Sequence, residues 1–326
     1  MTAPLDASGV RELAVLERSG FLESRHLGVA AVVAPDGSLL RAVGDVEALI
    51  FPRSSLKPVQ AVAVLRAGAV LDDDQLALAT ASHSGTDRHL AVVASTLASV
   101  GLDEGALGTP ADRPLDPAAR AAHPEPRRIA MTCSGKHAAF LAACVANDWS
   151  THDYLDPAHP LQQRIRDAVA EFTGQPVEHS GVDGCGAPVH AVSTRGLARA
   201  IGRIGREGSD DPHASRLAAA VRARPWAVAG PGRPDTVAIE RLGVFSKFGA
   251  EGIMVMATAD GTAVALKMLD GNGRAATMVA LELLVQAGAV ARDAVDEVIA
   301  ATTDPVTGGD TVVGRLRPSP ELAAEA

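Results

Sequence analysis

Apolar residues near the beginning of the chain form short runs that are separated by turn-forming residues. Residues 13–17 and 29–33 are the first two runs, and the second has no polar residue, so we expect both of its faces to be covered. The Ala-Pro-Asp-Gly sequence at 34–37 predicts a turn, after which residues 38–43 return as the partner strand of a hairpin. This end of the chain therefore predicts antiparallel strands.

The same pattern returns near the other end of the chain. Residues 252–258 and 263–269 are apolar runs joined by Asp260-Gly261, which predicts a second hairpin, and residues 311–316 predict a last strand. Between the two ends, helices are predicted at about 54–68, 75–81, 87–100, 131–147 and 160–172, with further small-residue helices up to about 223. Two more helices are predicted at 274–286 and 293–301.

This order predicts an α+β fold. Strands from both chain ends (about 10–45 and 250–317) form one antiparallel sheet of roughly four or five strands, and the middle of the chain (about 54–240) forms a helical layer. Because no internal repeat or low-complexity tract interrupts the chain, residues 1–326 are predicted to form a single domain. Residues 101–130 are rich in proline and lie between stretches with reactive side chains, so they predict an ordered loop or a lid.

Composition and charge limit the kinds of partner and the cellular compartment that this chain is expected to have. A net charge of −9 and the lack of a basic block exclude a nucleic-acid partner or an anionic membrane surface. The sequence shows neither a signal segment nor an apolar run long enough to span a bilayer. Three cysteines are a low and odd number, which does not suggest a disulfide scaffold. We therefore expect a cytoplasmic protein.

The first candidate for chemistry is the sequence Arg-Ser-Ser-Leu-Lys-Pro at 53–58. It places a hydroxyl (Ser54) and an amine (Lys57) three residues apart at the start of a helix, where positions i and i+3 are neighbours. A serine becomes a good nucleophile when an adjacent base takes its proton, and a lysine serves as that base if burial or another cation lowers its pKa. The alternative is a helix-capping serine with a solvated lysine one turn later.

Lys247 and Gly249 extend this pattern. A Ser-x-x-Lys sequence that begins a helix, together with a distant Lys-x-Gly at the start of a strand, resembles the layout of β-lactamases and penicillin-binding proteins. Here Phe248 stands where those enzymes have Thr or Ser, and the chain has no Ser-Asp-Asn triplet. The layout therefore predicts a serine acyl-transfer enzyme with a different substrate.

Two cysteines lie in glycine-containing loops beside charged residues, which is poor placement for core filling. These are Cys133 and Cys185, whereas Cys144 lies on an apolar helix and is predicted to be a core residue. A pair of thiolates needs a cation, so a zinc site is one interpretation and a disulfide is the other. Spacing alone favours His137 as a third zinc ligand.

Taken together, these stretches resemble the asparaginase II family, the rhizobial-type (class 3) L-asparaginases, which are similar in fold to serine-dependent glutaminases and β-lactamases. The matching stretches run in order along most of the chain, at residues 23–26, 53–58, 81–84, 133–137, 183–185 and 247–250. The Cys-Ser-Gly-Lys-His sequence at 133–137 is highly specific. The resemblance implies hydrolysis of the side-chain amide of L-asparagine to L-aspartate and ammonia.

The resemblance also implies the catalytic roles. Ser54 is then the nucleophile with Lys57 as its base, and Ser82 with Lys247 forms a second Ser-Lys pair in the same pocket. An acyl-enzyme forms and water then releases the product. The resemblance permits a homodimer.

Zinc is the cofactor that the resemblance implies, with Lys136 in place of His137 as the ligand beside Cys133 and Cys185. An amine binds a metal ion only when neutral, so the ion must lower the pKa of Lys136 strongly. The substrate-pocket residues that the resemblance implies are Arg53, His137 and Asp183. Of these, Arg53 suits the α-carboxylate of the substrate and Asp183 suits its α-ammonium group, although a structural turn is an alternative role for Asp183.

Three alternatives to an L-asparaginase stay open. A serine-dependent glutaminase or another small-amide amidohydrolase is the closest, since one methylene group separates glutamine from asparagine. A penicillin-recognising enzyme is disfavoured by the missing triplet. A non-enzymatic zinc-binding module predicts that Ser54 and Lys57 are dispensable while the two cysteines are not.

Overall fold

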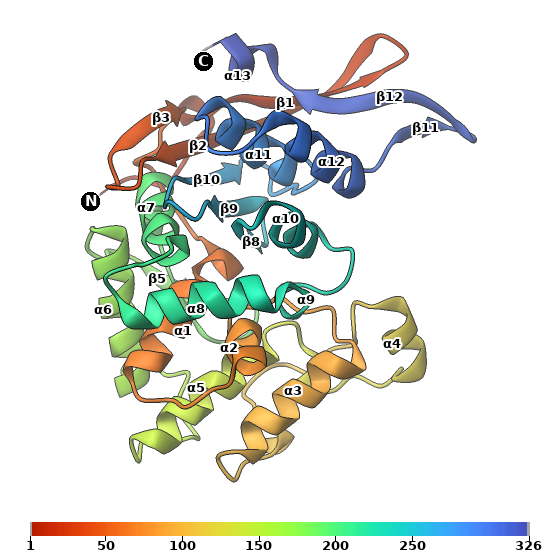
Figure 1. The fold of residues 1–326 in the computed structure, drawn as a ribbon. Coiled ribbons are helices and arrows are strands. Elements are labelled where there is room, and N and C mark those ends of the chain that lie inside the picture. Colours follow the sequence, from red (N-terminus) through yellow and green to blue (C-terminus); the bar gives the residue numbers. More distant parts are fainter. Residues whose placement is uncertain (1, 325–326) are drawn as a thin grey trace.

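Strands from both chain ends form one antiparallel sheet in the computed structural model, which describes residues 2–324. From one edge to the other, the strands are β11 (Val306–Gly308), β12 (Thr311–Pro318), β1 (Arg11–Arg18), β2 (Phe21–Val33), β10 (Ala263–Met268), β9 (Ile253–Ala257) and β8 (Phe245–Gly249), and β3 (Leu39–Val43) also pairs with β2. Figure 1 shows the red N-terminal strands beside the blue C-terminal ones. The predicted fold class is confirmed, but within the described residues the sheet has eight strands.

The central strand β2 explains the continuous apolar run near residue 30. Val29, Ala31 and Val33 belong to one buried cluster, and Ala30 and Val32 belong to the cluster on the other side of the sheet. Successive side chains of a strand point to opposite faces, so a strand covered on both faces has no polar position. The first half of β2 mixes polar and apolar residues and is largely exposed. It therefore shows no apolar run or alternation that would predict a strand.

Helices cover both faces of the sheet. One face packs against α7 (Thr194–Gly205), and the other packs against α11 (Ala276–Gln286), with α10 (Pro234–Leu242) and α12 (Arg292–Thr302) beside it. Gly205 lets α7 approach the sheet closely, because a Cβ there would lie 2.7 Å from the Cβ of Ala257. The described chain ends with α13 (Pro320–Ala324).

The middle of the chain forms the helical layer in the lower part of Figure 1. Its helices are α1 (Lys57–Arg66), α2 (Asp73–Ala79), α3 (Asp87–Ala98), α4 (Pro117–Ala122), α5 (Ser134–Ala146), α6 (Pro160–Thr173), α8 (Pro212–Ala223) and α9 (Pro225–Val228). Two small pairs of strands accompany them, β4 (Leu49–Ile50) with β7 (Val192–Ser193), and β5 (Ser180–Val182) with β6 (Pro188–His190). The short 3₁₀ helices are η1 (Ala7–Gly9), η2 (Arg53–Leu56), η3 (Glu104–Ala106) and η4 (Arg128–Ala130). No helix within residues 2–324 is both long and apolar enough to cross a membrane.

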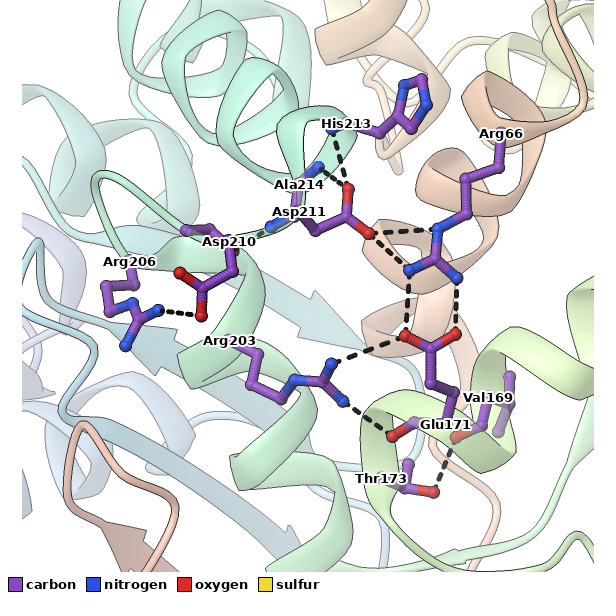
Figure 2. Close-up of polar contacts among 11 residues, drawn as sticks. Arg66, Val169, Glu171, Thr173, Arg203, Arg206, Asp210, Asp211, His213 and Ala214 are labelled. Atoms are coloured by element: carbon purple, nitrogen blue, oxygen red, sulfur yellow. Dashed lines mark hydrogen bonds and ion pairs between the residues drawn. The ribbon is translucent and has the colours of Figure 1, made fainter.

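Helix α1 begins at Lys57, three residues later than the sequence pattern predicts. Ser54 lies in η2, and Pro58 occupies the first turn of α1, where a missing backbone N–H costs no hydrogen bond. At the other end of α1, Arg66 pairs with Glu171 of α6 and with Asp211, the residue that caps α8 (Figure 2). These ion pairs connect α1 to two neighbouring helices.

Candidate active site

Two lysines meet on one serine hydroxyl in the interior. Lys57 Nζ and Lys247 Nζ each lie 3.1 Å from Ser82 Oγ. Ser82 belongs to the loop that follows α2, and its backbone N–H donates to Val228 O at 3.0 Å. The structure therefore brings together residues from the beginning of α1, the α2–α3 loop and the edge strand β8.

Ser54 lies in the same cavity but in a different environment from the one its spacing predicts. Lys57 Nζ donates to Ala81 O and to Ser82 Oγ, and the described residues contain no hydrogen bond between Ser54 and Lys57. Strand β8 passes close to η2 because of Gly249, where a Cβ would lie 2.8 Å from Pro52 O. This close approach places Ser54 and Lys247 on the wall of one cavity.

The amine of Lys247 is fully buried. Burial lowers the pKa of Lys247 to about 8, the carboxylate of Asp235 acts to raise it, and the charge of Lys57 lowers it further. Lys247 Nζ also donates to Phe248 O at 2.6 Å. The lowered pKa makes the neutral, proton-accepting form of Lys247 more available near neutral pH than it is for a free lysine.

Asp235 is a residue that the sequence analysis missed. Its carboxylate lies 3.8 Å from Lys247 Nζ, and it accepts hydrogen bonds from Ser246 Oγ (2.8 Å) and from the backbone N–H of Phe248 (3.0 Å). Only 3% of Asp235 is exposed. Asp235 follows Pro234 in the first turn of a helix, where acidic residues commonly complement the helix dipole. Its local sequence therefore does not distinguish it from an ordinary residue at a helix N-terminus.

The cavity has a volume of about 330 Å³, within the range of small-molecule sites. Polar side chains on its wall include those of Ser54, Ser82, Thr132, Asp235 and Lys247. The remaining wall residues are Leu115, Ala229, Arg233, Pro234, Phe248, Ala250, Gly273, Arg274, Thr277 and Thr302. Leu115 comes from the proline-rich segment 101–130, which is ordered and contains α4.

Cys133, Lys136 and Cys185 form a second buried cluster. Lys136 Nζ donates to Cys185 Sγ at 3.1 Å, and all three cysteines of the chain are free. The hydrogen bond from Cys185 holds the pKa of Cys133 well below its usual range, with help from Lys57 and Lys136, and it raises the pKa of Cys185. A thiolate is therefore favoured at Cys133 over Cys185. Burial acts to lower the pKa of Lys136, but the two sulfurs raise it.

This cluster fits a zinc ion by the chemistry of its donors. Two sulfurs and one amine converge, the pKa of the Cys133 thiol is held well below its usual range, and the group is shielded from water. Within residues 2–324, no group of three or more His, Cys, Asp or Glu side chains is arranged to hold a metal ion, and the predicted set has only two residues of these types.

Arg53 and Asp183 pair with each other. Arg53 Nε donates to Asp183 Oδ1 at 2.6 Å, and both side chains are largely buried. Arg53 has a φ of +50°, a left-handed conformation that costs about 1–3 kcal/mol in a residue with a side chain. Burial acts to raise the pKa of Asp183, but the hydrogen bond from Arg53 and the charge of Lys136 keep it below its usual value. Neither residue lines the cavity of Ser54.

His137 is fully buried on α5, one residue after Lys136. Its Nδ1 is 2.7 Å from Tyr154 Oη, and its Nε2 has no hydrogen-bond partner in the described part of the chain. Burial holds the pKa of His137 well below its usual range, and the charges of Lys136 and Lys57 add to this effect. His137 is not among the residues that line the cavity of Ser54.

Comparison with known proteins gives one match that covers most of the chain. The family model for L-asparaginase II matches residues 14–318. No protein with curated functions matches the chain.

Solved structures with a similar fold are distant in sequence. Mglu in its native form has a TM-score of 0.46 and 14% identity over 80% of this chain and 64% of the Mglu chain, so this chain spans less than two thirds of that protein. A beta-lactamase from Mycobacterium bovis (TM-score 0.37, 14% identity) covers 79% of this chain and 94% of its own, and a Bacillus glutaminase (0.37, 11%) covers 80% and 91%. Because these TM-scores lie below 0.5, the family assignment rests on the family model. That match spans well over half of the described residues and includes all the predicted site residues, so the chain belongs to the L-asparaginase II family.

Proposed function

We propose that this protein is an amidohydrolase that converts L-asparagine to L-aspartate and ammonia through a serine nucleophile and an acyl-enzyme. Family membership supports the reaction class. The observation that carries the mechanism is the contact of Lys57 Nζ and Lys247 Nζ with Ser82 Oγ, each at 3.1 Å, in a cavity that Ser54 also lines.

Proton transfer along this contact explains how a serine with no direct base is activated. Lys247 is the amine with a pKa lowered to about 8, so it accepts a proton from the hydroxyl of Ser82. Ser82 in turn takes a proton from the ammonium group of Lys57, to which it is hydrogen bonded. Lys57 is then neutral and receives the proton of Ser54, the neighbour one turn earlier.

The bonds that change follow from this assignment. Ser54 Oγ attacks the side-chain amide carbon, the C–N bond breaks, and the nitrogen leaves as ammonia with the proton taken from Ser54. Water then attacks the aspartyl ester and gives a proton to the neutral Lys57, the bond to Oγ breaks, and Lys57 passes this proton to Ser54. Ser82 remains uncharged in each resting state, because it passes on one proton for each that it receives.

Zinc belongs to the same proposal, held by Cys133, Lys136 and Cys185. A bound ion would join the start of α5 to the loop between β5 and β6 and would add positive charge beside the substrate site. Arg53 and Asp183 are proposed substrate-binding residues, as is His137. The first two now form an ion pair with each other, which a bound substrate must open.

A cytoplasmic homodimer is also proposed. The three free cysteines agree with a reducing compartment. Light scattering combined with size exclusion, which reports the mass of the particle in solution, tests the dimer.

Ammonia release from L-asparagine and from L-glutamine is the first test, because it separates the proposed asparaginase from a glutaminase. The second test is acid quenching during turnover of L-asparagine, followed by peptide mapping. We expect an aspartyl mass increase on the peptide that carries Ser54, absent in Ser54→Ala and retained in Ser95→Ala, a control on the exposed side of α3. Modification of the Ser82 peptide instead would reverse the roles of the two serines.

A further inference from the structure

Two arginines lie on the wall of the cavity that Ser54 and Lys247 share. These are Arg233, just before α10, and Arg274, just before α11. Within residues 2–324, neither side chain forms an ion pair with a carboxylate. These two exposed arginines therefore add positive charge to the cavity wall.

Arg274 differs from Arg233 because it is held in place. Its Nε donates to Nε2 of His26 at 2.9 Å, and its backbone N–H donates to Asn272 Oδ1 at 3.0 Å. His26 is a buried residue of β2, only 3% exposed. Burial lowers the pKa of His26, and the charge of Arg274 lowers it further while Asp270 opposes this, so the ring is neutral at pH 7 and accepts the hydrogen bond.

This anchor uses only Nε of the guanidinium group. The two terminal nitrogens of Arg274 make no hydrogen bond in the described residues. Their fixed, planar arrangement matches the two oxygens of a carboxylate. Arg53 is less suited to bind a carboxylate in this cavity, because its Nε already donates to Asp183 and its side chain does not line the cavity.

We propose that Arg274, anchored by His26, binds the α-carboxylate of the substrate in this cavity, so that the enzyme acts on small amides that carry a carboxylate. This proposal rests on the proposed amidohydrolase function and takes over the carboxylate-binding role predicted for Arg53. The cavity then holds the carboxylate at one wall and the amide carbon near Ser54 and Lys247 at another.

Activity on three substrates distinguishes carboxylate binding by Arg274 from a purely structural role of this residue. L-Asparagine carries both α groups, succinamate keeps the carboxylate but lacks the ammonium group, and β-alaninamide keeps the ammonium group but lacks the carboxylate. We expect Arg274→Ala to raise KM for the first two by about 10- to 100-fold, the worth of a charged hydrogen bond. Its kcat/KM for β-alaninamide should stay within about twofold.

Arg233→Ala is the matched control, because it removes the same charge from the same cavity wall but no anchored side chain. Its KM for L-asparagine should rise much less than that of Arg274→Ala. Arg274→Lys keeps the charge and loses the planar fork, so it should fall between the wild type and Arg274→Ala, which also guards against misfolding of the alanine variant. An equal loss on all three substrates, or a larger effect from Arg233→Ala than from Arg274→Ala, overturns the proposal.

Calorimetric binding of L-aspartate distinguishes this proposal from the proposed function. If the wild type hydrolyses none of the three amides, the amidohydrolase proposal fails, but L-aspartate still tests the carboxylate site. Weaker binding of L-aspartate by Arg274→Ala, by about tenfold or more, supports the site. Unchanged binding in Arg274→Ala, or no binding by the wild type, overturns it.

Discussion

Lys57 and Lys247, which lie far apart in the sequence, each place their amine 3.1 Å from the same oxygen, Oγ of Ser82. Two buried amines so close to each other disfavour a second positive charge. Asp235 beside Lys247 and the sulfur of Cys133 beside Lys57 supply the negative charge that makes this pairing tolerable. The pKa of Lys247 therefore depends on both Lys57 and Asp235.

The pH profile of the reaction should report Lys247. Because the neutral amine is the base, kcat/KM for L-asparagine should rise with pH through about 8. Asp235 raises the pKa of Lys247, so Asp235→Asn should shift this rise to lower pH. Initial rates between pH 5 and 10 measure the shift. Asp260→Asn, in the β9–β10 turn, should leave the profile in place, and an unmoved profile in Asp235→Asn would contradict the role of Asp235.

Replacement of Lys57 should remove activity. Lys57→Met keeps the length of the side chain but cannot relay a proton, and we expect kcat to fall by at least about 10³-fold. The residual activity should rise at higher pH than in the wild type, because the charge of Lys57 lowers the pKa of Lys247. Lys267→Met is the control, since this lysine of β10 bonds to Glu251 O away from the cavity. Near-normal turnover in Lys57→Met would show that the relay is wrong.

Metal content should depend on Cys133 and not on Cys144. Purified protein from zinc-supplemented medium should contain zinc at one ion per chain by elemental analysis, and Cys133→Ser should lose it and show a higher KM. Cys144→Ser is the matched control, because this cysteine is also buried and lies on α5, the helix that Cys133 precedes, and burial raises the pKa of Cys144 to about 11. A wild-type protein without stoichiometric zinc would remove zinc from the proposal.

Stability should depend on the network around Arg66 (Figure 2). Arg66 donates to Glu171 and Asp211 and also lies 5.2 Å above the ring of Phe172, so Arg66→Ala should lower the free energy of unfolding by about 1–2 kcal/mol. Arg206→Ala removes one exposed i,i+4 pair with Asp210 and should cost less than about 0.5 kcal/mol. Urea unfolding measures the free energy of unfolding of both variants. Equal losses in the two variants would contradict a stabilising network around Arg66.

Local sequence patterns were sufficient to predict many of the helices and strands of the fold. Continuous or alternating apolar runs identified several strands at both ends, and the helix predicted at 75–81 is α2, which begins two residues earlier behind its cap, Asp72. These features depend on residues within a few positions of one another. The strand at 21–28 was missed because its polar residues pair with β1 at an exposed part of the sheet.

The local sequence was enough to single out the candidate reactive residues, Ser54, Lys57, Ser82, Lys247 and the cysteines, because small or rigid residues flank each of them. The hydrogen-bond and ion-pair partners of these side chains follow only from the way distant segments pack together. Lys57 bonds to Ser82 and not to Ser54, Asp235 lies beside Lys247, and Arg274 rests on His26. The physical reason is that hydrogen bonds, burial and charge act across space, so the packing of α10, α11 and the α2–α3 loop against the sheet sets them, and no local spacing encodes that packing.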